Sequence, residues 1–455
     1  MKNMAAALHI DDLPQRVLIV GLGVTGLSCA RYLHGLGVPQ LLVADSREQP
    51  PGLDALRRQL PDVELFLGNF DRSLFAGAEM LVVSPGVALA TAEIQHALQQ
   101  GVPVVGDVEL FARQVQGKVA AITGSNGKST VTTLLGLMAA GKGAVTGGNL
   151  GKPVLDLLED EAALYVLELS SFQLETTASL APEVAVVLNV SADHMDRYAS
   201  LEAYAQVKSR VYEQAATGVY NLDDPRVMRM PRTPRRLFFT LGEPRGADCF
   251  GIRTSDGRAW LCRGDKPLLP ATELPLPGRH NLANALAALA MGTALALPMQ
   301  DMLQVLRTFP GLAHRTEYVR TCAGVKWYND SKGTNPGATV AALQGLHMGD
   351  DSRTVLIAGG DCKQADFSAL ARMIGKTARA VVLIGRDRRQ IRQALEVGIP
   401  IVDAVDMEEA VARAAELALP GDRVLLSPAC ASFDMFHGFE HRGAVFKDCV
   451  GRLRP

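Results

Sequence analysis

Residues that could bind a polyphosphate follow one another in a single segment, Gly124-Ser125-Asn126-Gly127-Lys128-Ser129-Thr130. An apolar stretch typical of a buried strand precedes the segment, and a helical pattern follows it. The backbone N–H groups of such a turn and the N-terminus of the next helix favour bound phosphate. The usual phosphate-loop pattern has glycine six residues before its lysine, where this chain has Ile122. The segment still predicts a nucleoside triphosphate site, in which Lys128 reaches the terminal phosphates and Ser129 binds Mg²⁺.

Two further residues are candidates for holding a metal ion. Glu168 lies near the end of a predicted strand, 165–169, and His194 follows another, 184–190. The carboxyl ends of parallel strands meet at one edge of a sheet, so we expect both side chains beside the phosphate loop. A hard cation prefers oxygen ligands and tolerates one imidazole. Taken alone, His194 could equally be a packed or solvated histidine. Lys208, in a predicted helix, is interpreted from sequence alone as a solvated lysine.

A second glycine-rich turn, Gly21–Gly26, follows the predicted strand 16–20 and precedes a helix. Asp45 closes the next predicted strand, where a ribose-binding acid would lie. This is the dinucleotide fingerprint in its usual βαβ context, and it predicts a Rossmann-like fold. The alternative is that the glycines serve only tight packing between helix and strand.

Polar residues also cluster after predicted strands in the last third of the chain. They occur in residues 330–336, 359–363 and 427–433, and would suit a small zwitterionic acid at one sheet edge. Ordinary loop polarity explains any one of them equally well. Arg315 lies just before this region and could clamp a transferring phosphoryl group.

The order of apolar stretches and helical patterns predicts an α/β protein, because continuous apolar strands are typical of parallel sheets covered on both faces. Three domains are expected: a Rossmann-like domain over 1–106, a central mononucleotide-binding domain over 107–311, and a Rossmann-like domain over 312–455.

Composition excludes several classes of protein. The net charge is −2 without long runs of one sign, so neither nucleic acid nor an anionic membrane is favoured as a partner. Seven scattered cysteines without CxxC spacing indicate a reducing compartment and no zinc site. Residues 1–14 lack the apolar core of a signal peptide, and the apolar span 282–299 is interpreted as a buried helix. We expect a cytoplasmic protein without membrane insertion.

Eight sequence blocks together resemble the Mur ligases of bacterial cell-wall synthesis, across nearly the whole chain. The blocks are GSNGKST (124–130), LELSSFQLE (167–175), NVSADHMDRY (189–198), PGRHNLANALAAL (277–289), HRTEYV (314–319), NDSKGTNPGAT (329–339), GGDCKQADF (359–367) and LLSPACASFDMF (425–436). The resemblance is strongest to the family members that add D-glutamate. Departures are small: Ser125 stands where many relatives have threonine, and the chain between His194 and Lys208 is about one residue shorter than in some relatives.

The resemblance implies a ligase that uses ATP to join D-glutamate to UDP-N-acetylmuramoyl-L-alanine, with Mg²⁺ as cofactor, two ions being expected, and a monomeric protein. It implies that the first domain holds the UDP-sugar through Gly23, Val24, Thr25, Asp45, Ser46, Ser84 and Asn149. It assigns ATP to Gly124, Ser125, Asn126, Gly127, Lys128, Ser129, Thr130, Asn284, Arg315 and Asp330.

The resemblance also implies the metal ligands and the catalytic residues. Lys208 aligns with a lysine that this family carbamylates, and a carbamate is an anionic oxygen ligand. The implied metal ligands are Ser129, Glu168, His194 and carbamylated Lys208, and the implied catalytic residues are Lys128, His194, Lys208 and Arg315. D-glutamate is assigned to Lys332, Thr334, Lys363, Ser432 and Phe439.

Other functions compete with this interpretation. A nicotinamide-dependent oxidoreductase would use Gly21–Gly26 and Asp45, but leaves the segment 124–130 unexplained. An ATP-dependent regulatory module would hydrolyse ATP without ligation. Ligases that add glutamate to folates share the phosphate loop, but the Gly21–Gly26 turn argues against them.

Overall fold

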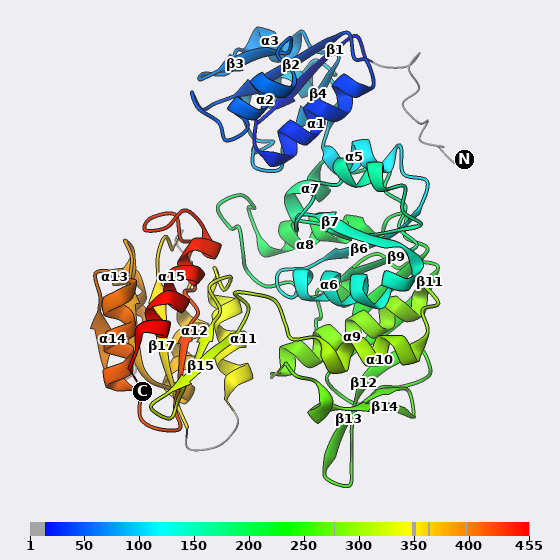
Figure 1. The fold of residues 1–455 in the computed structure, drawn as a ribbon. Coiled ribbons are helices and arrows are strands. Elements are labelled where there is room, and N and C mark those ends of the chain that lie inside the picture. The colour runs from blue at the N-terminus through cyan, green and yellow to red at the C-terminus, as the bar shows by residue number, and fades with distance from the viewer. Residues whose placement is uncertain (1–13, 277, 348–351, 363–364, 396–397, 455) are drawn as a thin grey trace. The chain divides into compact units, whose positions relative to one another are not determined.

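The computed structural model describes residues 14–276, 278–347, 352–362, 365–395 and 398–454 (Figure 1). The chain packs into two compact units. The first contains the chain up to Val190 with Arg197–Leu269 and Asn284–Val305, and the second contains Ser191–Asp196, Pro270–Ala283 and the chain from Leu306.

The N-terminal sheet of the first unit is parallel throughout, in the order β3-β2-β1-β4-β5. Its strands are β1 (Arg16–Val20), β2 (Gln40–Asp45), β3 (Glu64–Leu67), β4 (Met80–Val83) and β5 (Val104–Val105), and its helices are α1 (Val24–Gly35), α2 (Leu53–Gln59), α3 (Arg72–Ala76) and α4 (Ala92–Gln99). This is the predicted Rossmann-like arrangement, in which every connection between parallel neighbours crosses over through a helix or loop.

The central sheet has the order β14-β13-β12-β11-β10-β9-β6-β8-β7 in the described part of the chain. Its strands are β6 (Lys118–Thr123), β7 (Ala144–Gly148), β8 (Leu164–Glu168), β9 (Val184–Val187), β10 (Thr217–Asn221), β11 (Arg235–Phe239), β12 (Cys249–Ser255), β13 (Arg258–Arg263) and β14 (Lys266–Pro270). Every pair of neighbours along β12-β11-β10-β9-β6-β8-β7 is parallel. Strands β12 and β13 instead form an antiparallel hairpin, which was not predicted. Helices around this sheet are α5 (Asp107–Ala112), α6 (Lys128–Met138), α7 (Ser171–Glu175) and α8 (Leu201–Ser209).

The apolar span 282–299 forms a buried helix, as predicted, but the helix has different bounds. Helix α9 covers Arg279–Ala294, and α10 begins at Met299 and ends at Thr308. Pro298 cannot donate a backbone hydrogen bond and disfavours helix before it, so the chain turns there, with Ala296 at a φ of 53°. Within the described residues, the structure contains no helix both long and apolar enough to cross a bilayer.

The C-terminal sheet lies in the second unit and has the order β15-β16-β20-β17-β18-β19. Its strands are β15 (Glu317–Cys322), β16 (Val325–Asn329), β17 (Thr354–Gly359), β18 (Ala378–Ile384), β19 (Ile401–Asp403) and β20 (Arg423–Leu426), with helices α11 (Pro336–Leu346), α12 (Ser368–Thr377), α13 (Arg388–Ala394), α14 (Met407–Leu417) and α15 (Phe439–Arg452). Strands β16 to β19 are parallel as predicted, and β15 adds an antiparallel edge. The three sheets fall within the predicted segments 1–106, 107–311 and 312–455, whose boundaries stay predictions.

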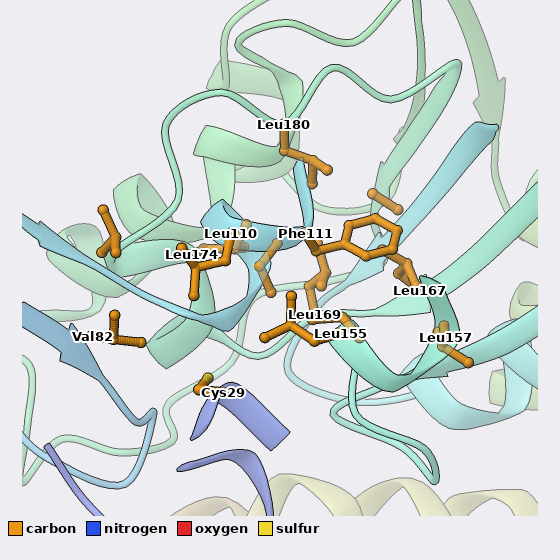
Figure 2. Packing of buried hydrophobic residues seen from close by; sticks show 14 of the residues in the cluster. Cys29, Val82, Leu110, Phe111, Leu155, Leu157, Leu167, Leu169, Leu174 and Leu180 are labelled. Carbon is orange, nitrogen blue, oxygen red and sulfur yellow. The ribbon is translucent and has the colours of Figure 1, made fainter. Parts of the chain in front are cut away.

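One continuous hydrophobic core joins the N-terminal and central sheets of the first unit. Figure 2 shows Cys29 of α1 and Val82 of β4 in the same cluster as Leu110 and Phe111 of α5 and Leu155. All seven cysteines are free and buried.

Helix α5 carries a buried acid into this core. Asp107 is 2% exposed, its Oδ2 accepts a hydrogen bond from Gln173 Nε2 at 2.9 Å, and its Oδ1 has no partner among the described residues. Burial raises the pKa of Asp107 from 3.8 to about 6 despite the hydrogen bond from Gln173, because the charged carboxylate is poorly solvated there.

Replacing Asp107 with asparagine should remove part of the pH dependence of stability. A raised pKa means that the folded protein binds the proton more tightly, so the free energy of unfolding falls as pH rises from about 4 to about 6. The loss is on the order of 3 kcal/mol. In urea unfolding, Asp107→Asn should be more stable than the parent at pH 7.5, with a much smaller difference at pH 4.5.

Asp71→Asn is the control, because this exposed carboxylate accepts hydrogen bonds from Ser73, which lower its pKa. Its stabilising effect is present above the ordinary pKa, so this variant should lose stability at pH 7.5. Equal pH dependence of Asp107→Asn and the parent would contradict the prediction.

Candidate active site

The phosphate loop joins β6 to α6 at the carboxyl edge of the central sheet. Gly124 has a φ of 149° and Gly127, which precedes the first residue of α6, a φ of 88°. A side chain at Gly127 would place its Cβ 2.4 Å from Oδ1 of Asn284, so only glycine allows this approach. The structure therefore brings Asn284, one of the residues assigned to ATP, against the loop. Ser129 and Thr130 lie in the first turn of α6 and are buried.

Two lysine side chains converge on the loop. Nζ of Lys128 donates to the carbonyl oxygens of Gly124 and Ser125, both at 2.9 Å, and Nζ of Lys208 donates to the Gly124 oxygen at 3.0 Å. Lys208 is 1% exposed and lies over the Tyr204 ring, 4.5 Å from its centre. The interpretation of Lys208 as a solvated helix lysine is therefore wrong, because α8 turns this side chain toward the loop.

Glu168 ends β8, directly beside β6, with Ile122 and Glu168 in register. It thus lies at the predicted sheet edge. Its Oε1 accepts a hydrogen bond from Asn149 Nδ2 at 2.6 Å, whereas Oε2 is buried without a hydrogen-bond partner among the described residues. A buried carboxylate oxygen without a partner is costly for stability unless a cation or a hydrogen-bond donor binds it.

The Glu168 carboxylate would suit a hard cation if the Ser129 hydroxyl and the oxygens of a bound phosphate supplied further ligands. No group of three or more histidine, cysteine, aspartate or glutamate side chains is gathered as a metal site in the part of the chain that the structure describes. A metal ion here would therefore depend on other oxygen ligands, such as hydroxyls and phosphates.

His194 belongs to the second unit, in the segment Ser191–Asp196. Its backbone is left-handed, with a φ of 57°, and its Nε2 lies 3.7 Å from Oδ2 of Asp193. Asp193 also accepts a hydrogen bond from Asn335 at 3.1 Å. The role of His194 as a metal ligand beside Glu168 stays a prediction.

Arg315 lies in a strained turn of the second unit. Its neighbours His314 and Thr316 have φ values of 62° and 46°, and a left-handed backbone is rare for a β-branched residue such as threonine. Asp330 holds the turn, since its carboxylate accepts hydrogen bonds from the Thr316 N–H at 3.0 Å and the Ser427 hydroxyl at 2.6 Å. Burial raises the pKa of Asp330 to about 6, although these hydrogen bonds oppose the shift.

A cavity of about 750 Å³ opens beside the Gly21–Gly26 turn of the first unit. All seven residues assigned to the UDP-sugar line it: Gly23, Val24, Thr25, Asp45, Ser46, Ser84 and Asn149. Gly26 packs so closely that a Cβ would lie 1.9 Å from the Gly21 oxygen, whereas Gly23 has open space around it. Arg47, Phe70 and Gln173 also line the cavity and were not predicted from the sequence.

The Asp45 carboxylate is already engaged within the protein. It accepts hydrogen bonds from the Leu22 N–H at 2.7 Å and from two guanidinium nitrogens of Arg47 at 2.8 and 2.7 Å. Burial opposes ionisation, but these donors together hold the pKa of Asp45 below its ordinary value. Asp45 is 2% exposed. Its carboxylate therefore stabilises the Gly21–Gly26 turn, and it is poorly placed to bind the ribose of a nicotinamide cofactor.

The residues assigned to D-glutamate lie in the second unit. Nζ of Lys332 is 3.8 Å from the centre of the Phe439 ring, which brings these two together. Ser432 is buried and Thr334 exposed. Lys363 lies outside the described residues.

Asn189 is a residue that sequence reasoning left without a role. Its Oδ1 accepts a hydrogen bond from the Asn126 N–H at 2.9 Å, its Nδ2 donates to the Asn126 oxygen at 3.0 Å, and its backbone oxygen accepts from the Ser125 N–H at 3.0 Å. The side-chain amide of Asn189 thus makes the same two hydrogen bonds to Asn126 that the backbone of a neighbouring strand would make. Its position two residues after β9 was the available signal.

Three family models match successive parts of the chain. They are "Mur ligase MurD-like, N-terminal domain" over residues 15–106, "Mur ligase middle domain" over 122–292 and "Mur ligase, glutamate ligase domain" over 314–430. The chain belongs to the Mur ligase family. This membership confirms the resemblance that the sequence blocks indicated.

Full-length relatives share about half of their residues with this Mur ligase. The UDP-N-acetylmuramoylalanine–D-glutamate ligase of Nitrosococcus oceani is 54% identical over 96% of both chains. The protein of that name from Marinobacter nauticus is 52% identical over 96% of this chain and 98% of its own.

Among solved structures, UDP-N-acetylmuramate-alanine ligase from Thermotoga maritima matches 96% of this chain and 99% of its own, with a TM-score of 0.61 and 18% identity. MurF from Acinetobacter baumannii matches 96% of this chain and 90% of its own, with a TM-score of 0.61 and 17% identity. These likenesses show the shared three-domain α/β fold.

Replacing Asn189 with alanine should weaken nucleotide binding. The variant loses both side-chain hydrogen bonds to Asn126, so the loop no longer holds its shape before the ligand arrives. We expect the Kd for a non-hydrolysable ATP analogue, measured by calorimetry, to rise about tenfold.

Asn221→Ala is the matched control. Asn221 donates to the Leu188 oxygen at 2.8 Å, at the same sheet edge, without contacting the loop. This variant should bind the analogue as the parent does. Unchanged affinity in Asn189→Ala would remove Asn189 from the site.

Proposed function

We propose that this Mur ligase joins D-glutamate to UDP-N-acetylmuramoyl-L-alanine with hydrolysis of ATP to ADP and phosphate. The single observation that carries the proposal is the glycine-rich loop on which the Lys128 and Lys208 side chains converge, beside Glu168 at the end of the neighbouring strand. The full-length relatives named for this reaction support the choice of substrates. We further propose that the enzyme acts as a cytoplasmic monomer.

The cavity of the N-terminal sheet is proposed to hold the UDP-sugar. Helix α1 begins at Val24 with no acidic residue in its first turn, so its N-terminus favours a pyrophosphate there. Asn149 contacts Glu168 and lines this cavity, which connects the sugar site with the phosphate loop. Asn149 is therefore proposed to contact the sugar-peptide beside the reacting carboxylate.

Mg²⁺, proposed as two ions, would be held by Ser129, Glu168, His194 and carbamylated Lys208. It would offset the repulsion between the ATP phosphates and the attacking carboxylate. Oε2 of Glu168, buried with no hydrogen-bond partner among the residues described, supports a cation at this edge. The burial of Lys208 beside Lys128 supports a carbamate, because a carbamate on Lys208 would attract the Lys128 ammonium group.

Amide formation from a free carboxylate is uphill, so the carboxylate needs a leaving group. The L-alanine carboxylate attacks the γ-phosphorus of ATP, which forms an acyl phosphate and releases ADP. Lys128 and Arg315 are proposed to stabilise the transferring phosphoryl group. The D-glutamate amine then attacks the acyl carbon, loses a proton, and phosphate leaves from the tetrahedral intermediate.

Phosphate release with UDP-N-acetylmuramoyl-L-alanine, ATP and a panel of D- and L-amino acids tests the proposed function. Release should require all three substrates and should be fastest with D-glutamate. Hydrolysis that proceeds without an amino acid would favour a regulatory ATPase, and a nicotinamide-dependent change in absorbance would favour an oxidoreductase.

Replacing Lys208 with alanine should reduce turnover by more than about a hundredfold, because a metal ligand is lost. Short carboxylic acids added to the assay should restore part of the activity by supplying the missing oxygen ligand. Lys118→Ala, on the exposed first residue of β6 in the same sheet, should keep parental activity. Full activity of Lys208→Ala would exclude Lys208 from the mechanism.

A further inference from the structure

A buried arginine lies beneath the segments assigned to D-glutamate. Arg442 is in the first half of α15 and is 1% exposed. Neither the resemblance nor the proposed mechanism gives it a role.

The guanidinium of Arg442 joins two loop segments from different strand ends. Its Nε and Nη2 donate to Oγ and the backbone oxygen of Ser331, at 3.0 and 2.8 Å. Its Nη1 donates to the backbone oxygens of Cys430 and Ala431, at 3.2 and 3.3 Å. Ser331 follows β16 by two residues, whereas Cys430 and Ala431 follow β20. One side chain therefore sets the spacing between the two segments.

The charge of this guanidinium is not balanced by a hydrogen-bonded carboxylate. All four acceptor oxygens are neutral, and none of the described carboxylates forms an ion pair with Arg442. Burial lowers the pKa of Arg442 to about 10, although the nearby carboxylates of Asp434 and Asp330 oppose the shift, so the side chain stays charged at neutral pH. A buried cation whose hydrogen-bond acceptors are all neutral is costly for stability, which favours a role for its charge beyond the folding of this unit.

The residues next in sequence to these contacts are those assigned to the amino-acid substrate. Ser331 precedes Lys332, and Ala431 precedes Ser432. The Ser331 hydroxyl also donates to the Phe439 oxygen at 2.8 Å, which ties the first turn of α15 to the same segment. D-glutamate carries two carboxylates and one ammonium group, so a nearby positive charge favours it.

We propose that Arg442 is a positioning and specificity-determining residue for the acidic amino acid. It holds the segments of Lys332 and Ser432 at a fixed spacing, and its charge favours a substrate of net negative charge. The inference rests on the proposed function and adds a residue that does not itself touch the substrate.

A purely structural role is the competing explanation. The same unit offers a comparison in Arg379, at the start of β18, whose guanidinium pairs with the buried Asp422. That arginine has an anionic partner and lies at the opposite ends of the strands from Lys332 and Ser432. Arg442 has the contrasting combination of neutral acceptors and a place beside the substrate segments.

The test compares Arg442→Met, Arg442→Lys and the control Arg379→Lys in full-length enzyme, with KM measured for each of the three substrates. Arg442→Met removes both the forked hydrogen bonds and the charge, so the KM for D-glutamate should rise at least about tenfold. The KM values for ATP and the UDP-sugar should stay within about twofold. Arg442→Lys keeps the charge and should raise the KM for D-glutamate only about threefold.

Arg379→Lys should lower the unfolding midpoint without changing any KM. Equal increases of all three KM values in Arg442→Met, or an unchanged KM for D-glutamate, would overturn the proposal. If Arg442→Met does not fold, Arg442→Lys decides, because a parental KM for D-glutamate in that variant would also overturn it. Parental enzyme that releases no phosphate with D-glutamate would instead refute the proposed function.

Discussion

Two positive charges meet at the carbonyl oxygen of Gly124, and the structure around the phosphate loop depends on keeping them there. Nζ of Lys128 and Nζ of Lys208 both donate to this oxygen, so the two side chains converge on one point of the loop. The amide of Asn189 on Asn126 and the glycines at 124 and 127 hold the loop in the shape that receives both side chains.

The topology of the sheets made much of this site predictable. Because β6 and β8 are parallel neighbours, a residue that ends one must lie beside the loop that follows the other, and Glu168 does. The burial of Lys208 could not be predicted in this way. It depends on which face of α8 packs against the loop, and the helix is polar enough in sequence to allow either. The hydrogen bonds between Asn189 and Asn126 likewise depend on the path of the loop after β9, which no sequence pattern predicts.

The hydrogen-bond partners of individual side chains also could not be predicted from the sequence. Asp45 was expected at the end of β2 and is there, but its carboxylate is occupied by Leu22 and Arg47. Similarly, the motif around Arg315 gave no sign that Thr316 has a left-handed backbone. The antiparallel strands β13 and β15 were missed because the expectations were built on parallel strands joined by helices.

The packing of α5 limits how domains can be exchanged between members of this family. Five of its residues are buried, and its side chains share one core with α1 and β4 on one side and with Leu155 on the other. Ser28 and Arg31 of α1 also bind Asp156. A chimera that took only residues 15–106 from a relative would therefore join two halves of a core that had not evolved together. Grafts that carry α5 and the segment 155–160 together with residues 15–106 preserve that shared packing.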